Sequence, residues 1–269
     1  MSAPNHIPVS AYMITFNNGR TVERALKSLH WVDEIVVVDS FSTDATVEIV
    51  KRYATRFEQR QWPGFRDQYQ YASDLCRHEW RLFIDADEEI ASRLAEEMQS
   101  ELSRNAERPE TERISGYQGH RRTFYLGRWI MHGGWVPDHE IRLYHRDKGS
   151  WKGDLHAKVH VDGPEADFAH FYYHYTYADI SDHIQTVDRY TTTAAEDMVR
   201  NGKRFSWYHL FGNPLVRFLR EYLLKGGFLD GMPGFIVAVN SMYYVFMKHA
   251  KLWEVQRVTA REPDPGSEP

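Results

Sequence analysis

Short apolar runs alternate with helix-like segments over the first hundred residues. The apolar runs have the length of strands, and the successive residues Val36, Val37 and Val38 indicate a strand buried on both faces. The segments between the runs space apolar residues three and four apart, as amphipathic helices do. The predicted strands are 7–16, 33–40, 57–62 and 80–85, and the predicted helices are 19–31, 43–54, 65–76 and 90–102. This alternation predicts an α/β fold with a mainly parallel central sheet and helices on both faces.

The pattern changes after about residue 105, where the chain becomes rich in aromatic residues, glycine and histidine. Short strand-like runs follow, and then helical spacing from Asp179 onward. The predicted strands of this half are 140–146, 157–162 and 168–175, and its last two predicted helices are 207–227 and 233–254. We therefore expect three parts, namely a catalytic domain at 1–178, a C-terminal helical extension at 179–257 and a disordered tail at 258–269.

The composition narrows the class of protein. A net charge of −5 argues against nucleic acid as a partner. The single cysteine, Cys76, excludes an internal disulfide and suits a reducing compartment. The first residues show no basic segment followed by a long apolar one, so we expect no signal peptide and a cytoplasmic location. The 8 Trp, 16 Tyr and 14 Phe suit sugar-binding platforms as well as large cores.

Polar residues gather where three predicted strands end. In parallel α/β sheets, ligands bind at the carboxyl ends of the strands. The residues at these ends are Thr15, Phe16, Asn17, Asp39, Asp85, Ala86 and Asp87. Each acidic group has an alternative interpretation, since carboxylates also begin helices, where they suit the positive end of the helix dipole. Three polar strand ends at one edge nevertheless favour a binding site.

The spacing Asp85-x-Asp87 suits a hard divalent cation, Mg²⁺ or Mn²⁺, bound through oxygen ligands. The first strand runs into TFNNGRT rather than a GxGxxG turn, which weakens a dinucleotide-binding interpretation. A phosphatase of the DxD type would carry its nucleophile after the first strand, whereas this pair lies about eighty residues further on. A nucleotide-sugar site fits better, with the base or ribose near Asp39 and the diphosphate on a metal at the carboxylate pair.

Longer motifs resemble those of family 2 glycosyltransferases, and most closely the branch that adds β-glucose to the lipopolysaccharide core. The resemblance covers roughly residues 7–253 and rests on DEIVVVDSFSTDATVEI, WRLFIDADEE and WVPDHEIRLYHR. It implies a GT-A fold, an inverting mechanism and a nucleotide-diphosphate sugar donor, with UDP-glucose expected. It further implies that Thr15, Asn17 and Asp39 hold the nucleoside, and that the two aspartates hold the metal and diphosphate.

Two positions depart from the pattern of that branch. A basic residue usually follows the GF pair, whereas here the stretch is Gln68-Tyr69-Gln70, with Arg66 nearby. We expect Arg66 and Gln68 to belong to the donor site, with Arg66 taking over the phosphate contact. The second departure is His156-Ala157, where the family often has His-Glu.

An inverting transfer needs a base to take the proton of the acceptor hydroxyl. The base should come from the second half of the chain, because the first half provides the donor groups. Asp138 in WVPDHEIRLYHR is the first candidate and Glu140 the second, and a simple turn role for Asp138 is the alternative. His156 is a candidate third metal ligand or sugar contact. We expect His170, His174 and His183 to be structural.

Six Lys or Arg and one acid lie between residues 200 and 225, beside an apolar face that includes Leu215, Leu219 and Leu223. A basic amphipathic helix is typical of an anionic membrane surface, although packing on the catalytic domain is an alternative. The apolar run 235–247 is too short to span a bilayer. We therefore expect a peripheral enzyme on the inner face of the bacterial inner membrane, acting on a lipid-linked saccharide. Other polyprenyl-linked or exopolysaccharide acceptors, and a catalytically silent nucleotide-sugar-binding protein, remain alternatives.

Overall fold

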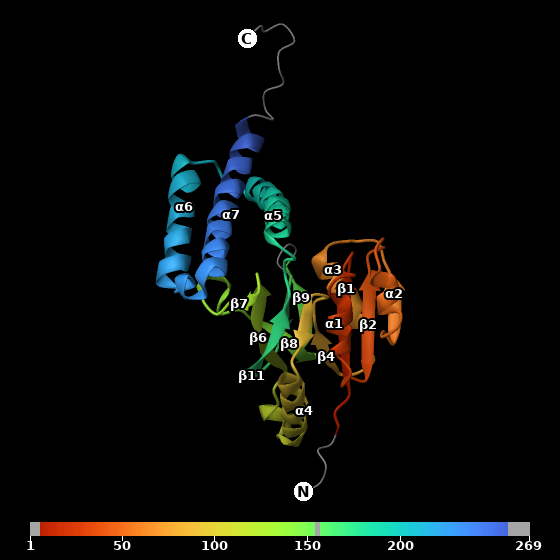
Figure 1. The fold of residues 1–269 in the computed structure, drawn as a ribbon. Helices are drawn as coiled ribbons and strands as arrows, with labels where there is room; N and C mark the ends of the chain where they lie inside the picture. Colours follow the sequence, from red (N-terminus) through yellow and green to blue (C-terminus); the bar gives the residue numbers. More distant parts are fainter. Residues whose placement is uncertain (1–5, 154–156, 258–269) are drawn as a thin grey trace, which may run out of the picture. The chain divides into compact units, whose positions relative to one another are not determined.

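The computed structural model describes residues 6–153 and 157–257 (Figure 1). The chain divides into two compact units. The first contains the residues up to Thr123 together with Asp138–Tyr175, and the second contains Phe124–Pro137 and the residues from Thr176 onward. The boundary predicted after residue 178 lies close to the second division. The segment 124–137, which we had placed in the catalytic domain, groups instead with the C-terminal helices.

The first unit is built on a mixed sheet with the strand order β3-β2-β1-β4-β8-β6-β11-β5. The four strands β3, β2, β1 and β4 are mutually parallel, as predicted. Beyond β4 the sheet is mixed, because β8 runs antiparallel to both β4 and β6. The strands are β1 (Val9–Thr15), β2 (Glu34–Asp39), β3 (Arg56–Gln59), β4 (Trp80–Phe83), β5 (Glu88–Ile90), β6 (Gly116–Tyr125), β8 (His139–His145) and β11 (Glu165–His174).

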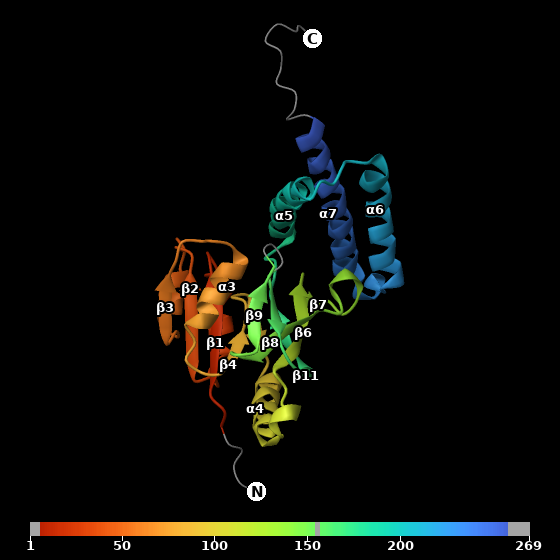
Figure 2. The ribbon, with the colours of Figure 1, turned by 180° about the vertical axis from the view of Figure 1, so that it is seen from behind.

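Helices cover both faces of this sheet, which can be followed in Figures 1 and 2. The alternation of side chains along β1 separates two cores, with Ala11 and Met13 on one face and Tyr12 on the other. The first core packs against α1 (Val22–Lys27), α2 (Thr46–Val50) and α4 (Ser92–Glu107). The second core packs against α3 (Phe65–Asp74) and the ribbon of β9 (Gly149–Lys152) and β10 (Lys158–Val161).

The second unit consists of three long helices and the segment 124–137. The helices are α5 (Ile180–Arg200), α6 (Trp207–Leu219), which continues into a π-helical turn at Arg220–Leu224, and α7 (Gly231–Arg257). The short strand β7 (Arg128–Trp129) pairs with the last residues of β6.

Buried polar contacts join the segment 124–137 to these helices. The buried carboxylate of Asp230 accepts hydrogen bonds from the backbone N–H groups of Met131 and His132, at 2.9 and 2.8 Å. His183 lies in an aromatic cluster, stacked on Tyr177 at 4.1 Å and hydrogen-bonded to the Tyr125 hydroxyl at 3.0 Å. These contacts are long-range, so the composition of the segment did not indicate them.

Candidate functional site

The parallel strands β1, β2 and β4 end at one edge of the sheet, and the predicted donor residues follow them directly. Thr15 is paired with Asp39 in the β1–β2 ladder, and the Asp85–Asp87 turn follows β4. Since all three segments belong to the first unit, the structure brings the sequence-predicted strand ends together. The site is described below from the nucleoside side toward the acceptor side.

The Asp39 carboxylate is buried and accepts four hydrogen bonds. Thr15 Oγ1 donates to it at 2.9 Å, Gln59 Nε2 at 3.0 Å and the Ser42 N–H at 2.8 Å, and the Ser42 hydroxyl donates as well. These bonds explain why a charged group is tolerated at the end of a buried strand. They occupy the acceptor capacity of the carboxylate, so a nucleoside N–H would have to replace one of them. Asp39 is therefore the residue that fixes the loop after β2.

Asn17 joins the loops that follow β1 and β2. Its N–H donates to Ser42 Oγ at 2.8 Å, and its side-chain oxygen accepts the Thr43 N–H at 2.8 Å. Asn17 has a φ of 55°, in the left-handed region that asparagine tolerates better than most residues. On these same loops, the rings of Phe16 and Phe41 are 59% and 50% exposed. Phe41 was not predicted, because an isolated apolar residue in a loop gives no periodic signal.

The first turns of α3 contribute differently from what the family pattern implies. Gln68 is fully buried, and its Nε2 donates to Ser40 Oγ at 3.2 Å. Arg66 is exposed and pairs with Asp67 at 2.9 Å. Tyr69, which stands where the family usually has a basic residue, donates its hydroxyl to Asp85 Oδ1 at 2.7 Å. Burial and the charge of Asp85 raise the pKa of Tyr69, so the hydroxyl keeps its proton and acts as the donor.

The carboxylate pair lies on a tight turn after β4 and is mostly buried, with part of each side chain exposed to solvent. The side chains of Asp85 and Asp87 are each 29% exposed, and Ala86 between them is buried. His174, the last residue of β11, places its Nε2 3.3 Å from Asp87 Oδ2. This contact places the imidazole beside one carboxylate of the pair, and Asp85 lies two residues away on the same turn. We had expected His174 to be structural, since nothing local in the sequence distinguishes it from the other histidines.

The two aspartates have opposite pKa shifts. Burial, together with the charges of Glu88 and Asp87, raises the pKa of Asp85 to about 7, although Arg142 opposes the shift. Burial acts in the same direction on Asp87, but His174 and Arg121 outweigh it and hold the pKa of Asp87 below its usual value. The turn thus combines one readily ionised carboxylate with one whose ionisation is disfavoured by burial and by the neighbouring acids.

A buried charge network lies behind this turn. Glu88 accepts a hydrogen bond from Arg142 Nη2 at 2.8 Å and from the Asp85 N–H at 2.9 Å, and it lies 3.5 Å from Arg121 Nη1. Arg142 is sandwiched between the rings of Phe83 and Tyr172, at 4.5 and 4.4 Å from their centroids. Its Nη1 lies 3.9 Å from Asp85 Oδ2. Among the described residues, this nitrogen has no hydrogen-bond partner.

The same network reaches both predicted bases. Asp138 forms an ion pair with Arg121, whose Nε donates to Asp138 Oδ2 at 2.7 Å. Glu140 accepts a hydrogen bond from Arg142 Nη2 at 3.2 Å. Glu140 also borders a cavity of about 200 Å³, together with Trp151 of β9 and with residues of β6, β8, β10 and β11. The third candidate, His156, lies outside the described residues.

Comparison with known proteins identifies the family. Residues 10–156 match the family model described as "Glycosyl transferase family 2". The chain belongs to glycosyl transferase family 2. This glycosyltransferase is 31% identical to the "Lipopolysaccharide core biosynthesis glycosyltransferase LpsC" of Rhizobium meliloti (strain 1021) over 95% of each chain. It is 29% identical to the "Uncharacterized glycosyltransferase RT0209" of Rickettsia typhi, over 92% of this chain and 87% of the relative.

A solved structure supports the GT-A fold of the glycosyltransferase. The mannosyltransferase PcManGT from Pyrobaculum calidifontis, whose structure is a complex with GDP-Man and Mn²⁺, matches with a TM-score of 0.51. The match covers 94% of this chain and 89% of that chain at 14% identity. The predicted fold class is therefore confirmed, with a sheet that is parallel from β3 to β4 and mixed beyond, and with a C-terminal helical region.

The second unit of the glycosyltransferase exposes a large apolar surface. Its most exposed apolar side chain is that of Leu224, at 83%. Other exposed large apolar residues on α6 and the turns that follow it are Trp207, Tyr208, Phe211, Leu215, Val216, Leu219, Leu223, Phe228 and Leu229. Within the described ranges, no single helix is both long and apolar enough to cross a bilayer. The two segments Trp207–Leu224 and Gly227–Arg257, bent by 70° relative to each other, together have the length and composition of a span.

Proposed function

We propose that this enzyme is a metal-dependent inverting glycosyltransferase that moves glucose from UDP-glucose to a saccharide of the lipopolysaccharide inner core. The observation that carries the proposal is the Asp85–Asp87 turn at the carboxyl edge of the sheet, where both aspartates are partly exposed and His174 Nε2 lies 3.3 Å from Asp87 Oδ2. The 31% identity to a relative described as a lipopolysaccharide core biosynthesis glycosyltransferase supports the choice of acceptor.

On the donor side, the loops after β1 and β2 would hold the nucleoside. Asp39 and Asn17 fix these loops, and the exposed rings of Phe16 and Phe41 are available to a planar base. Asp85, Asp87 and His174 would hold Mg²⁺ or Mn²⁺. When bound, this ion would stabilise the negative charge of the leaving diphosphate. Tyr69 would orient the Asp85 carboxylate through its 2.7 Å hydrogen bond.

On the acceptor side, a carboxylate at the start of β8 would remove the proton of the attacking hydroxyl. Asp138 remains our first candidate. Glu140 is the second candidate, and the cavity it borders favours it as a neighbour of a bound sugar. Both carboxylates contact arginines of the network around Glu88, which would keep them in place relative to the metal-binding turn.

We further propose that the second unit binds an anionic membrane surface. Leu223 and Leu224 are exposed apolar residues that lie between Arg220 and Lys225 in the sequence. Apolar side chains beside basic ones suit an interface of acyl chains and anionic headgroups. Enzyme and lipid-linked acceptor would then share one surface.

The decisive experiment measures donor binding and product formation together. Calorimetry with UDP-glucose should show binding that requires Mn²⁺ or Mg²⁺ and is lost in Asp87→Ala. The exposed Asp147→Ala, which removes a carboxylate at a turn after β8, serves as the control and should bind normally. Metal-independent binding, or an Asp87→Ala variant with normal turnover and an intact circular dichroism spectrum, would refute the metal role.

A second measurement separates the acceptor classes. Radiolabelled glucose should pass to a truncated lipopolysaccharide core and not to a polyprenyl-linked sugar. Transfer to the polyprenyl acceptor alone would redirect the proposal, while donor binding without transfer to either would favour a nucleotide-sugar-binding role.

Membrane binding is tested with vesicles. Sedimentation with phosphatidylglycerol vesicles should fall in Leu223→Asp/Leu224→Asp and remain unchanged in Val199→Asp, an exposed site on α5. Equal binding of the two variants would contradict this surface.

A further inference from the structure

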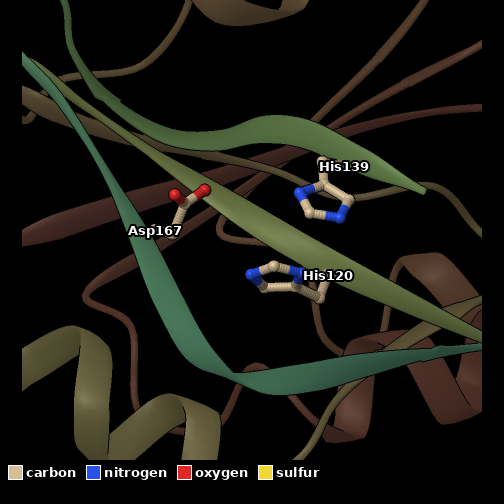
Figure 3. Close-up of side chains that lie close together, drawn as sticks. All are labelled: His120, His139 and Asp167. Atoms are coloured by element: carbon tan, nitrogen blue, oxygen red, sulfur yellow. The ribbon is translucent and has the colours of Figure 1, made fainter. Parts of the chain in front are cut away.

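Three side chains on neighbouring strands form a cluster apart from the carboxylate pair. They are His120 on β6, His139 on β8 and Asp167 on β11, and Figure 3 shows the two imidazole rings next to each other with the carboxylate to one side. One potential ligand atom from each residue lies within 4.8 Å of the other two. The ring centroids of the two histidines are 4.2 Å apart.

The strand pairing explains why these residues meet. His120 and His139 are directly opposite each other in the antiparallel β6–β8 ladder, so their side chains project from the same face. Asp167 pairs with Gln118, two residues before His120 and therefore on that face as well. The arrangement is thus a property of the sheet and does not depend on a loop.

An irregularity in β11 lies beside the cluster. Asp167 pairs with Gln118 and Phe171 with His120, so four steps along β11 correspond to two steps along β6. A bulge of this kind redirects side chains and is frequent near functional sites. Phe171 then packs edge-on against the His120 ring, at 6.0 Å between centroids, and limits the rotation of that ring.

The three side chains are available as ligands. Within residues 6–153 and 157–257, none of them has a side-chain hydrogen bond or an ion pair. His139 and Asp167 are exposed and His120 is partly buried, so an ion could enter from solvent. His139 also borders the cavity of about 200 Å³ that Glu140 borders.

We propose that His120, His139 and Asp167 form a second metal site, which binds a divalent transition-metal ion of the Zn²⁺ type. Two imidazoles and one carboxylate favour Zn²⁺, Co²⁺ or Ni²⁺ over Mg²⁺, whose preferred ligands are all oxygens. Ligand atoms around a tetrahedral Zn²⁺ stand roughly 3.3 Å apart, given metal–ligand distances of about 2.0–2.1 Å. Side-chain rotations would close the remaining gap, and water would complete the shell.

Such an ion would connect β8, β6 and β11 at the start of β8. His139 lies between Asp138 and Glu140, so a ligand bond at His139 would restrain the backbone that carries both proposed bases. The site would act as a positioning element, and its existence does not depend on the proposed sugar-transfer function.

The test uses the full chain, freed of any affinity tag and treated with a chelator. Excess Mg²⁺ is added to occupy oxygen-ligand sites, and Co²⁺ is titrated while its visible absorption is recorded, with Zn²⁺ calorimetry in parallel. We expect one equivalent to bind. Because loss of a second-shell partner already weakens metal binding about 10–100-fold, His139→Asn and Asp167→Asn should each weaken it at least about tenfold. His30→Asn, at an exposed histidine elsewhere in the first unit, and Asp87→Ala should leave it unchanged.

A second readout is independent of the affinity. Zn²⁺ should slow amide hydrogen exchange at the start of β8 in the parent chain, and His120→Asn should abolish this protection. Absence of binding under excess Mg²⁺, or equal binding by all cluster variants, would overturn the proposal. Loss of Co²⁺ binding in Asp87→Ala alone would assign the ion to the carboxylate pair instead.

Discussion

Glu88 provides a strong test of the buried charge network. Its carboxylate is 1% exposed and lies against Arg142 Nη2 at 2.8 Å, the Asp85 N–H at 2.9 Å and Arg121 Nη1 at 3.5 Å. Glu88→Gln keeps the shape but removes the charge. It also replaces one acceptor oxygen with an NH2 group that can only donate, so either Arg142 or the Asp85 N–H loses its acceptor.

The loss of unfolding free energy in Glu88→Gln depends on which carboxylates Arg142 and Arg121 still contact. Removing one partner of a buried ion pair costs about 3–5 kcal/mol. Arg142 would retain Glu140 at 3.2 Å and Asp85 at 3.9 Å, and Arg121 would retain Asp138. We therefore expect the lower end of this range, about 3 kcal/mol of unfolding free energy.

The control for this variant is on the same short strand. Glu89→Gln removes a carboxylate that accepts a hydrogen bond from the Tyr175 hydroxyl at 2.9 Å and is only partly buried. It should cost about 1 kcal/mol, the usual net value of a hydrogen bond. Urea unfolding gives the free energies, and amide hydrogen exchange along β4 and β8 localises the loss to the first unit. Equal losses for the two variants, or a neutral Glu88→Gln, would refute the reasoning.

Three further predictions concern the reaction and the helical unit. His174→Ala should weaken Mn²⁺-dependent UDP binding about 10–100-fold by calorimetry, because it removes the imidazole beside the carboxylate pair; an unchanged affinity would return this histidine to a structural role. Asp138→Asn and Glu140→Gln should be compared, and the substitution that removes the catalytic base should lower kcat roughly 10²–10⁴-fold while the Kd of the donor stays unchanged. Full turnover in both variants would place the base elsewhere. Burial lowers the pKa of His183 to about 4, so its neutral form stabilises the fold above its unfolded pKa of about 6.5, and this contribution is lost as the pH falls toward 4. Acid titration followed by circular dichroism should show this loss, at most about 3 kcal/mol, and His183→Gln should flatten it; identical acid profiles would contradict the assignment.

The first half of the fold could be predicted because its strands and helices are indicated by patterns among residues close together in the sequence. Strands buried on both faces appear as uninterrupted apolar runs, and the helices between them keep one apolar stripe. The short strand β3 and the helices α1 to α3 were likewise found near their predicted positions. The carboxyl ends of these strands then follow from topology alone, which is why Thr15, Asp39 and Asp85 could be placed at one edge.

The long strand β6 was not predicted, for a physical reason. Its two faces read as Tyr117, Gly119, Arg121 and Thr123 against Gln118, His120 and Arg122, so neither face is uniformly apolar. One face carries the arginine that pairs with Asp138, and the other carries the His120 cluster. A strand that serves two polar sites loses the hydrophobic alternation by which strands are recognised.

The residues missed at the site were those supplied from far along the chain. Glu88 was noticed only as part of an acidic run, and Arg142 only as part of a motif. Their contact spans 54 residues. His174 reaches Asp87 only because β11 pairs with β5 immediately after the carboxylate turn. Patterns among neighbouring residues cannot indicate such pairings, because these depend on the strand order in the mixed part of the sheet beyond β4.

The reversal of strand direction at β8 explains why the proposed metal-binding carboxylates and the candidate bases lie at the same edge of the sheet. In the antiparallel β4–β8 ladder, Trp80 pairs with His145 and Leu82 with Leu143, so the residue numbers of each pair sum to 225. Continuing that register places Asp85 opposite Glu140, and the 3.9 and 3.2 Å contacts of Arg142 with these two carboxylates agree with it. A parallel strand at this position would begin at the opposite edge. Because β8 is antiparallel, the candidate bases at its start lie beside the carboxylates at the end of β4.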